Sequence, residues 1–209
     1  MFLKKIIVGP LETNCYLVAC KNTKNAAVID PGGEEEVDII LKNLQENNFN
    51  LEYIINTHGH IDHITGNRAL KEKTKAILLI HRLDAPMLSD VNKNFSIFMG
   101  KERCSPPADR YLEEGEEISL GKLKLKIIHT PGHTPGGICL ILNNIVFTGD
   151  TLFAGSVGRT DLPGGSYHDL QKSIKEKLLV LNDDKIIYPG HGPDSTIGEE
   201  RRTNPYIKN

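Results

Sequence analysis

A short run of histidines with one aspartate has the spacing of metal ligands. The run is His58-Gly-His60-Ile-Asp62-His63. Because one glycine separates His58 from His60, both imidazole rings can point the same way from an extended segment, and two further ligand types follow one step along. One short loop is therefore predicted to supply ligands to two metal ions.

Three more residues of the same types stand directly after apolar, strand-like runs. They are His133, Asp150 and His191, and glycines close to each of them let the backbone make sharp turns. Imidazole and carboxylate ligands without thiolate suit zinc, iron or manganese, and a carboxylate such as Asp150 can bridge two ions. Water bound to such a metal can reach a pKa of about 7, so the predicted chemistry is hydrolysis at neutral pH.

The elements that must position these residues fall into two similar halves. Apolar periodicity and turn signals predict strands at residues 4–8, 15–19, 26–29, 53–56, 76–80, 117–120, 123–128, 138–142, 145–148 and 185–188, and helices at 34–47, 67–73 and from Ser166 onward. Each half is a β-meander followed by a helix and a further strand, which predicts two sheets face to face with helices outside. Strand ends of such a sandwich can bring the ligands to one edge. Residues 91–111 show no clean period and are interpreted as a functional loop or as surface covering.

Composition limits the class of protein. A length of 209 residues favours one domain spanning 1–209, and a net charge of -2 gives no support to a nucleic-acid partner. No stretch approaches the roughly 18 consecutive apolar residues of a membrane span, and residues 1–10 are interpreted as an edge strand rather than a signal peptide. The cysteines are scattered and form no Cys-x-x-Cys pair, so a reducing compartment, the cytoplasm, is expected.

With these residues assembled, the sequence resembles the metallo-β-lactamase superfamily from residue 13 to the last strand. In residues 149–165 and 200–205 it is similar to the glyoxalase II (hydroxyacylglutathione hydrolase) group, especially its short bacterial members. The resemblance implies an α/β (α+β) fold, a four-layer αββα sandwich of two mixed sheets. It also implies that one metal is bound by His58, His60 and His133, that the other is bound by Asp62, His63 and His191, and that the bridge is Asp150.

The mechanism implied by the resemblance is attack of a metal-bridging hydroxide on the carbonyl of a small acyl thioester of the S-lactoylglutathione type. Asp62 and Asp150 are the catalytic carboxylates in this reading, as ligands of two divalent ions. Zinc is the expected metal, with iron or manganese as alternatives. Because a thiol has a pKa of about 8.5, a thiolate leaves without a dedicated general acid.

The chain departs from the family after its last histidine. Full-length glyoxalase II enzymes continue into a helical domain that helps to grip glutathione, whereas eighteen residues follow His191 here. No separate C-terminal helical domain is therefore expected, and other residues must hold the thiol. Arg159 aligns with a basic residue that contacts the thiol's carboxylate in the family and is the candidate substrate anchor, with a salt bridge to Asp161 as the alternative.

Other functions stay open on the sequence. A persulfide dioxygenase would hold a single iron at His58, His133 and Asp150, but such proteins tend to carry Ala-His-Asp-Tyr where this chain has Gly-His191-Gly-Pro. A β-lactamase would be expected to be secreted and often to have cysteine at the position of Asp150. A non-enzymatic site would be closed by protein ligands, which the His/Asp set argues against. The remaining histidines are interpreted as structural: His81, His129 and His168.

Overall fold

The N-terminal half of the chain forms a six-stranded mixed sheet. The computed structural model describes residues 1–100 and 102–207. The strands of the first sheet lie in chain order: β1 (Phe2–Val8), β2 (Thr13–Ala19), β3 (Asn25–Ile29), β4 (Asn50–Ile55), β5 (Ile77–His81) and β6 (Arg110–Leu112). The first three pair antiparallel, and β3 to β6 pair parallel. The predicted edge strand is β1, in register Ile6 to Cys15 with β2.

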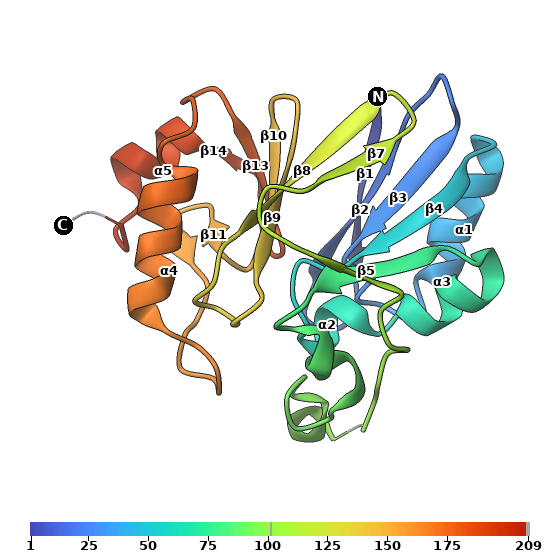
Figure 1. The fold of residues 1–209 in the computed structure, drawn as a ribbon, viewed down its shortest axis with the longest axis horizontal. Coiled ribbons are helices and arrows are strands. Elements are labelled where there is room, and N and C mark those ends of the chain that lie inside the picture. Colours follow the sequence, from blue (N-terminus) through green and yellow to red (C-terminus); the bar gives the residue numbers. More distant parts are fainter. Residues whose placement is uncertain (101, 208–209) are drawn as a thin grey trace.

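The C-terminal half forms a second six-stranded sheet that faces the first (Figure 1). Its strands are β7 (Glu117–Leu120), β8 (Leu123–His129), β9 (Ile138–Leu142), β10 (Ile145–Gly149), β13 (Ile186–Pro189) and β14 (Ser195–Thr196), in the order β14-β13-β10-β9-β8-β7. Only β10 and β13 pair parallel in this sheet. A small hairpin, β11 (Leu152–Phe153) and β12 (Ser156–Val157), follows β10.

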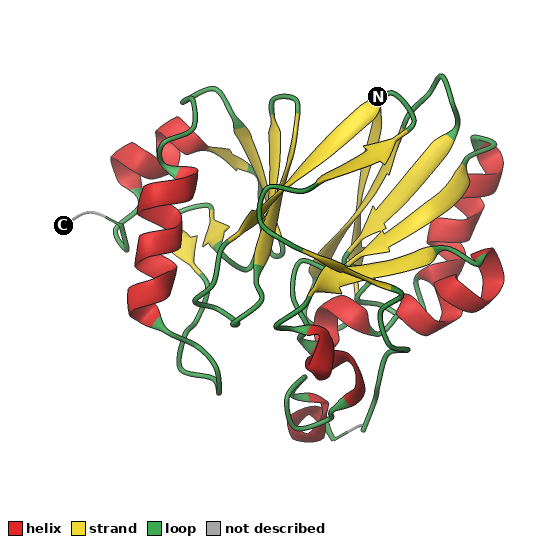
Figure 2. Ribbon diagram, viewed as in Figure 1, coloured by secondary structure: helices red, strands yellow, loops and turns green. Residues whose placement is uncertain are grey.

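Helices cover the outer faces of both sheets (Figures 1 and 2). On the first sheet these are α1 (Val37–Glu46) and α3 (Asn67–Thr74), and on the second α4 (Tyr167–Ser173), its π-helical continuation η3 (Ile174–Leu178) and α5 (Ile197–Thr203). The predicted cap of α4 is present, because the Ser166 hydroxyl accepts a hydrogen bond from the Asp169 amide at 3.2 Å. Among the described residues, no helix has the length and apolarity needed to cross a bilayer.

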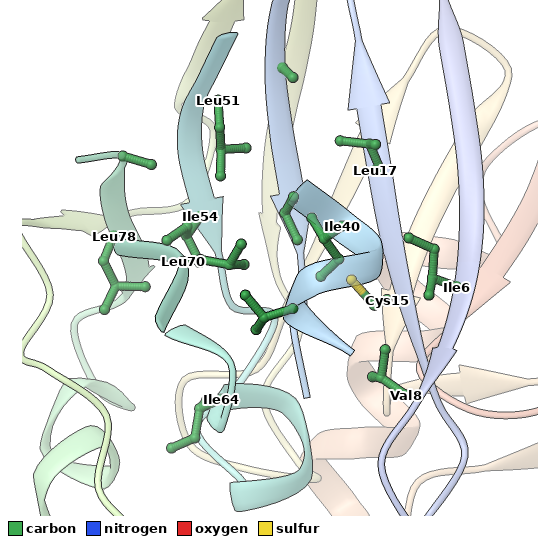
Figure 3. Packing of buried hydrophobic residues seen from close by; sticks show 14 of the residues in the cluster. Ile6, Val8, Cys15, Leu17, Ile40, Leu51, Ile54, Ile64, Leu70 and Leu78 are labelled. Carbon is green, nitrogen blue, oxygen red and sulfur yellow. The ribbon is translucent and has the colours of Figure 1, made fainter. Parts of the chain in front are cut away.

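Three apolar layers hold the four layers of secondary structure together. The first lies between the helices and the first sheet, where Ile40 of α1 meets Leu17 and Ile54 of the strands (Figure 3). The second lies between the sheets and includes Tyr16 and Phe147, whose ring centroids are 5.1 Å apart. The third lies under α4 and α5. The predicted αββα sandwich of two mixed sheets is therefore confirmed.

Two local predictions differ from the structure. Residues after β4 were expected to form a loop, but Ile61–Ile64 make one helical turn, α2, because Ile61 and Ile64 are both buried in the first apolar layer. Residues 91–111 were expected to be irregular, but they include the 3₁₀ helix η2 (Ser96–Met99) and the start of β6. With only three residues, β6 is too short to show an alternating pattern.

Candidate metal centre

All seven residues with ligand spacing meet at one edge of the sandwich. His58 follows β4, His133 follows β8, Asp150 follows β10 and His191 follows β13, so both sheets contribute. Asp62 and His63 lie on α2, and His60 is the extended residue that precedes it. The expectation that strand ends converge is confirmed.

The side chains form three overlapping groups whose ligand atoms lie within 4.8 Å of one another. The groups are His58 with His60 and His133, His58 with His63 and Asp150, and Asp62 with His63 and His191. Within the first, His60 Nδ1 and His133 Nε2 are 2.9 Å apart. On the other side, His191 Nε2 lies 3.2 Å from Asp62 Oδ2. The first and third groups correspond to the two ligand sets that the family resemblance implies.

Asp150 faces both histidine groups. Its Oδ1 lies 3.4 Å from His63 Nε2, and its Oδ2 lies 3.6 Å from both His133 Nε2 and His191 Nε2. Among the described residues, Asp150 Oδ1 and His58 Nε2 are buried with no hydrogen-bond partner. An orphaned buried polar atom costs roughly 1–3 kcal/mol, which a cation between these atoms would offset. The donor set therefore fits divalent metal ions.

Burial and neighbouring charges divide the histidines into two electrostatic types. Burial lowers the pKa of His58 well below its usual value and that of His60 to about 3, so both rings are in the neutral form that binds metals. Burial alone would also lower the pKa of His63 and His191, but Asp62 and Asp150 raise both. Although burial would raise the pKa of Asp62, His63 and His191 hold it well below its usual range.

Zinc binding to the metal-free protein is expected to release protons near neutral pH. His63 and His191 have raised pKa values, so each ring is protonated below its pKa in the folded protein and must become neutral to bind a metal. Zinc affinity should therefore rise with pH until these pKa values are passed. Calorimetric titration at pH 6 and pH 8, in buffers of different ionisation enthalpy, should show a release of about one to two protons at the lower pH. Binding without proton release at both pH values would contradict this charge arrangement.

Carbonyl and carboxylate oxygens orient the ligand rings from behind. His133 Nδ1 lies 2.8 Å from the Arg159 carbonyl oxygen, and His191 Nδ1 lies 3.0 Å from the Leu11 carbonyl oxygen. These contacts fix which nitrogen of each ring faces the centre. Thr13 donates from its hydroxyl to Asp62 Oδ2 at 3.2 Å.

Sequence reasoning missed Asp30, which supports the centre from the end of β3. Its carboxylate accepts hydrogen bonds from the Thr57 amide and hydroxyl, both at 2.7 Å, and its Oδ2 lies 3.0 Å from His63 Nδ1. The signal was present, because Asp30 follows an apolar strand and precedes two glycines at 32 and 33, as the ligands do. A β-carbon on Gly32 would collide with the backbone of Asp62.

The centre opens into a cavity of about 380 Å³ with apolar walls. The apolar lining residues are Leu11, Ile61, Phe95, Phe98 and Leu162. The Phe95 ring lies 5.3 Å from the His60 ring, centroid to centroid. Arg159, the predicted anchor, lines the cavity, and its guanidinium donates to both carboxylate oxygens of Asp161 at 2.8 and 2.7 Å. The anchor and the salt-bridge alternatives of the sequence are thus both visible in the same side chain.

The three remaining histidines lie outside the centre. His81 and His129 stack on each other with ring centroids 4.1 Å apart. His168 is exposed in the first turn of α4. None of the three belongs to a ligand group among the described residues.

Comparison with known proteins agrees with this fold and this centre. The model of the metallo-beta-lactamase superfamily matches residues 8–191. The hydroxyacylglutathione hydrolase GloC of Haemophilus influenzae is 38% identical, with 99% of this chain and 98% of that protein covered. The probable metallo-hydrolase YqgX of Bacillus subtilis is 33% identical, with 98% and 96% covered.

Solved structures give the same result. The B3 metallo-beta-lactamase BLEG-1 superposes with a TM-score of 0.93 at 32% identity and full coverage of both chains. TTHA1623, in a di-iron-bound form, has a TM-score of 0.86 at 36% identity, with 97% of this chain and 99% of that one covered. ETHE1 from Myxococcus xanthus has a TM-score of 0.84 at 31% identity, with 98% and 84% covered.

The αββα sandwich with a His/Asp cluster at one edge defines a class of proteins that bind divalent metals and are generally metal-dependent hydrolases. The chain belongs to the metallo-beta-lactamase superfamily.

Proposed function

We propose that the protein hydrolyses small acyl thioesters, of the 2-hydroxyacyl type exemplified by S-lactoylglutathione, at a dinuclear metal centre. The observation that carries this proposal is the make-up of the cavity wall. Among the described residues that line it, the titratable side chains are candidate metal ligands and Arg159. No lining group is left to protonate a poor leaving group, and a thiolate does not require one.

The ligand arrangement supports the hydrolytic step. We assign one ion to His58, His60 and His133, the other to Asp62, His63 and His191, and the bridge to Asp150. Divalent ions held there polarise a carbonyl and lower the pKa of water towards about 7. Zinc fits this nitrogen and oxygen donor set, and the di-iron form of TTHA1623 makes iron the alternative.

The surrounding residues support a small uncharged acyl group. Leu11, Phe95 and Phe98 form an apolar rim, and the Phe98 side chain is exposed beside the centre. These residues would shed water from the reacting carbonyl. The 38% identity to a hydroxyacylglutathione hydrolase over nearly the whole of both chains points to the same substrate class. The four cysteines are all free thiols, which agrees with a cytoplasmic location.

A substrate comparison tests the proposal. Zinc-loaded protein should release thiol from S-lactoylglutathione with a much higher kcat/KM than that for opening a chromogenic β-lactam. A β-lactam leaves as an amine, which needs a proton that the described lining residues do not supply. Faster turnover of the β-lactam would reject thioester hydrolysis as the function and would align the chain with BLEG-1.

Replacing Arg159 by alanine should raise KM for S-lactoylglutathione about five- to tenfold with little change in kcat, as expected for loss of one exposed charged contact. The backbone carbonyl that orients His133 remains in this variant, so the ligand ring stays in place. The control is Asp161→Ala, which keeps the guanidinium and removes its partner. Steady-state kinetics of both variants check the prediction. An unchanged KM for Arg159→Ala would reject the anchor role.

A further inference from the structure

Asp84 is a buried carboxylate that joins the two halves of the candidate metal centre. It follows β5 and precedes the 3₁₀ helix η1 (Ala85–Ser89), and its side chain is fully buried. Its Oδ2 accepts hydrogen bonds from the Gly59 amide at 3.1 Å and the Thr134 hydroxyl at 2.7 Å. Its Oδ1 accepts from the Gly136 amide at 2.6 Å. One carboxylate therefore binds the loop of the first sheet and the loop of the second.

The residues that Asp84 binds are the neighbours of metal ligands. Gly59 lies between His58 and His60, and Thr134 follows His133 directly. The rings on these two loops must come close, because His60 Nδ1 and His133 Nε2 are 2.9 Å apart. A carboxylate that fixes both backbones sets the separation of the two rings.

The packing around Asp84 leaves the two loops no room to shift. A β-carbon on Gly59 would lie 2.4 Å from Met87 Cβ, and a β-carbon on Gly136 would lie 2.5 Å from the Asp84 amide nitrogen. Both positions therefore require glycine, because the turn that carries Asp84 occupies the space. This contact gives a physical reason for the glycine within the His-Gly-His run.

The charge of Asp84 has no cationic side chain to balance it. Among the described residues, no lysine or arginine forms an ion pair with this carboxylate. Its partners are two backbone amides and one hydroxyl. A buried carboxylate held only by dipoles is costly unless a positive charge lies nearby, and a cation bound by His60 and His133 would provide one.

We propose that Asp84 is a positioning residue for one of the two metal sites, the site of His58, His60 and His133. This inference rests on the proposed dinuclear centre. Asp84 does not belong to any of the ligand groups and acts through the two loops that it holds. Loss of its carboxylate should weaken metal binding at this site and leave the site of Asp62, His63 and His191 unchanged.

The test is a zinc titration of the metal-stripped full-length chain, monitored with a competing chromophoric chelator. Asp84→Asn keeps the size of the side chain but places an amide group against N–H donors. It should bind one zinc as tightly as the wild type and the other about 10- to 100-fold more weakly. The matched control is Glu200→Gln. Glu200 is a buried carboxylate that accepts from Gly155, Ser195 and Asn204 at 2.8, 2.5 and 2.7 Å. It should bind two zinc ions like the wild type.

A double-mutant cycle separates positioning from general destabilisation. In a His60→Ala background, where the affected site has already lost a ligand, adding Asp84→Asn should cause no further loss of zinc affinity. Should Asp84→Asn not fold by circular dichroism, Thr134→Val removes one hydrogen bond alone and should weaken the same site to a smaller degree.

Additive losses in the cycle, or equal weakening of both zinc sites, would overturn the positioning role. A wild-type chain that binds no zinc would instead overturn the proposed function, and the inference with it. The two failures are therefore distinguishable.

Discussion

Replacing Asp150 by asparagine is expected to lower kcat/KM for thioester hydrolysis on the order of a thousandfold or more. The carboxylate lies 3.4 Å from His63 on one side and 3.6 Å from His133 on the other, so it is placed to contact both ions. An amide of the same shape offers one neutral oxygen and cannot bridge two cations. Steady-state thiol release measures the effect, and the metal content of the variant should fall below that of the wild type.

The control for this substitution is Asp38→Asn on α1. Asp38 is an exposed carboxylate whose partner is Lys73 at 2.8 Å, in the outer helical layer. Exposed ion pairs of this kind contribute little, so its kcat/KM should stay within about twofold of the wild type. If Asp150→Asn kept kcat/KM within tenfold of the wild type, the assignment of Asp150 as the bridge would be wrong.

Metal removal should lower thermal stability as well as activity. The metal-free centre holds several unsatisfied or mutually repelling groups, among them the buried His58 Nε2 and Asp150 Oδ1. A ligand present at 100 to 1,000 times its Kd stabilises the folded state by about 2.7–4.1 kcal/mol. For a chain of this size we expect the Tm to rise by about 5–15 °C on zinc addition.

Differential scanning calorimetry of the metal-stripped and zinc-loaded protein measures this shift. Calcium, which prefers oxygen ligands, is the matched control and should leave the Tm of the stripped protein nearly unchanged. Equal Tm values with and without zinc would mean that the cluster does not bind this metal in the folded chain.

The sequence was sufficient to predict the residues that meet at the centre. Alternation through Gly59 placed His58 and His60 on the same side of an extended segment, and their rings lie 4.8 Å apart. Each remaining ligand outside the run follows an apolar strand, and the ends of strands in a two-sheet sandwich share an edge. Local patterns carried this information, so one sequence revealed it.

The residues that support the centre could not be predicted with the same ease. Asp84 binds Gly136, which lies 52 positions further along the chain, and no local pattern marks this pairing. Asp30 stands in the same strand-end setting as the ligands, but it lacks a neighbouring histidine to draw attention. Such contacts depend on how the two halves of the sandwich pack.

The segment 91–111 shows why irregular loops escape prediction. Phe95 adopts a left-handed backbone with φ of 67°. Its neighbours Asn94 and Ser96 are fully buried, and the side chains of both bind the Arg103 carbonyl oxygen, at 3.0 and 3.1 Å. The Asn94 carbonyl also accepts from the Ile61 amide of α2 at 2.9 Å. These non-local bonds place Phe95 against His60, and they leave no periodic signal in the sequence.

The most direct measurement is the metal content of one purified preparation together with its anaerobic activity on S-lactoylglutathione. Our account predicts two divalent ions per chain and thiol release that proceeds without dioxygen. One iron per chain, with turnover only of a persulfide and only when dioxygen is present, would contradict it.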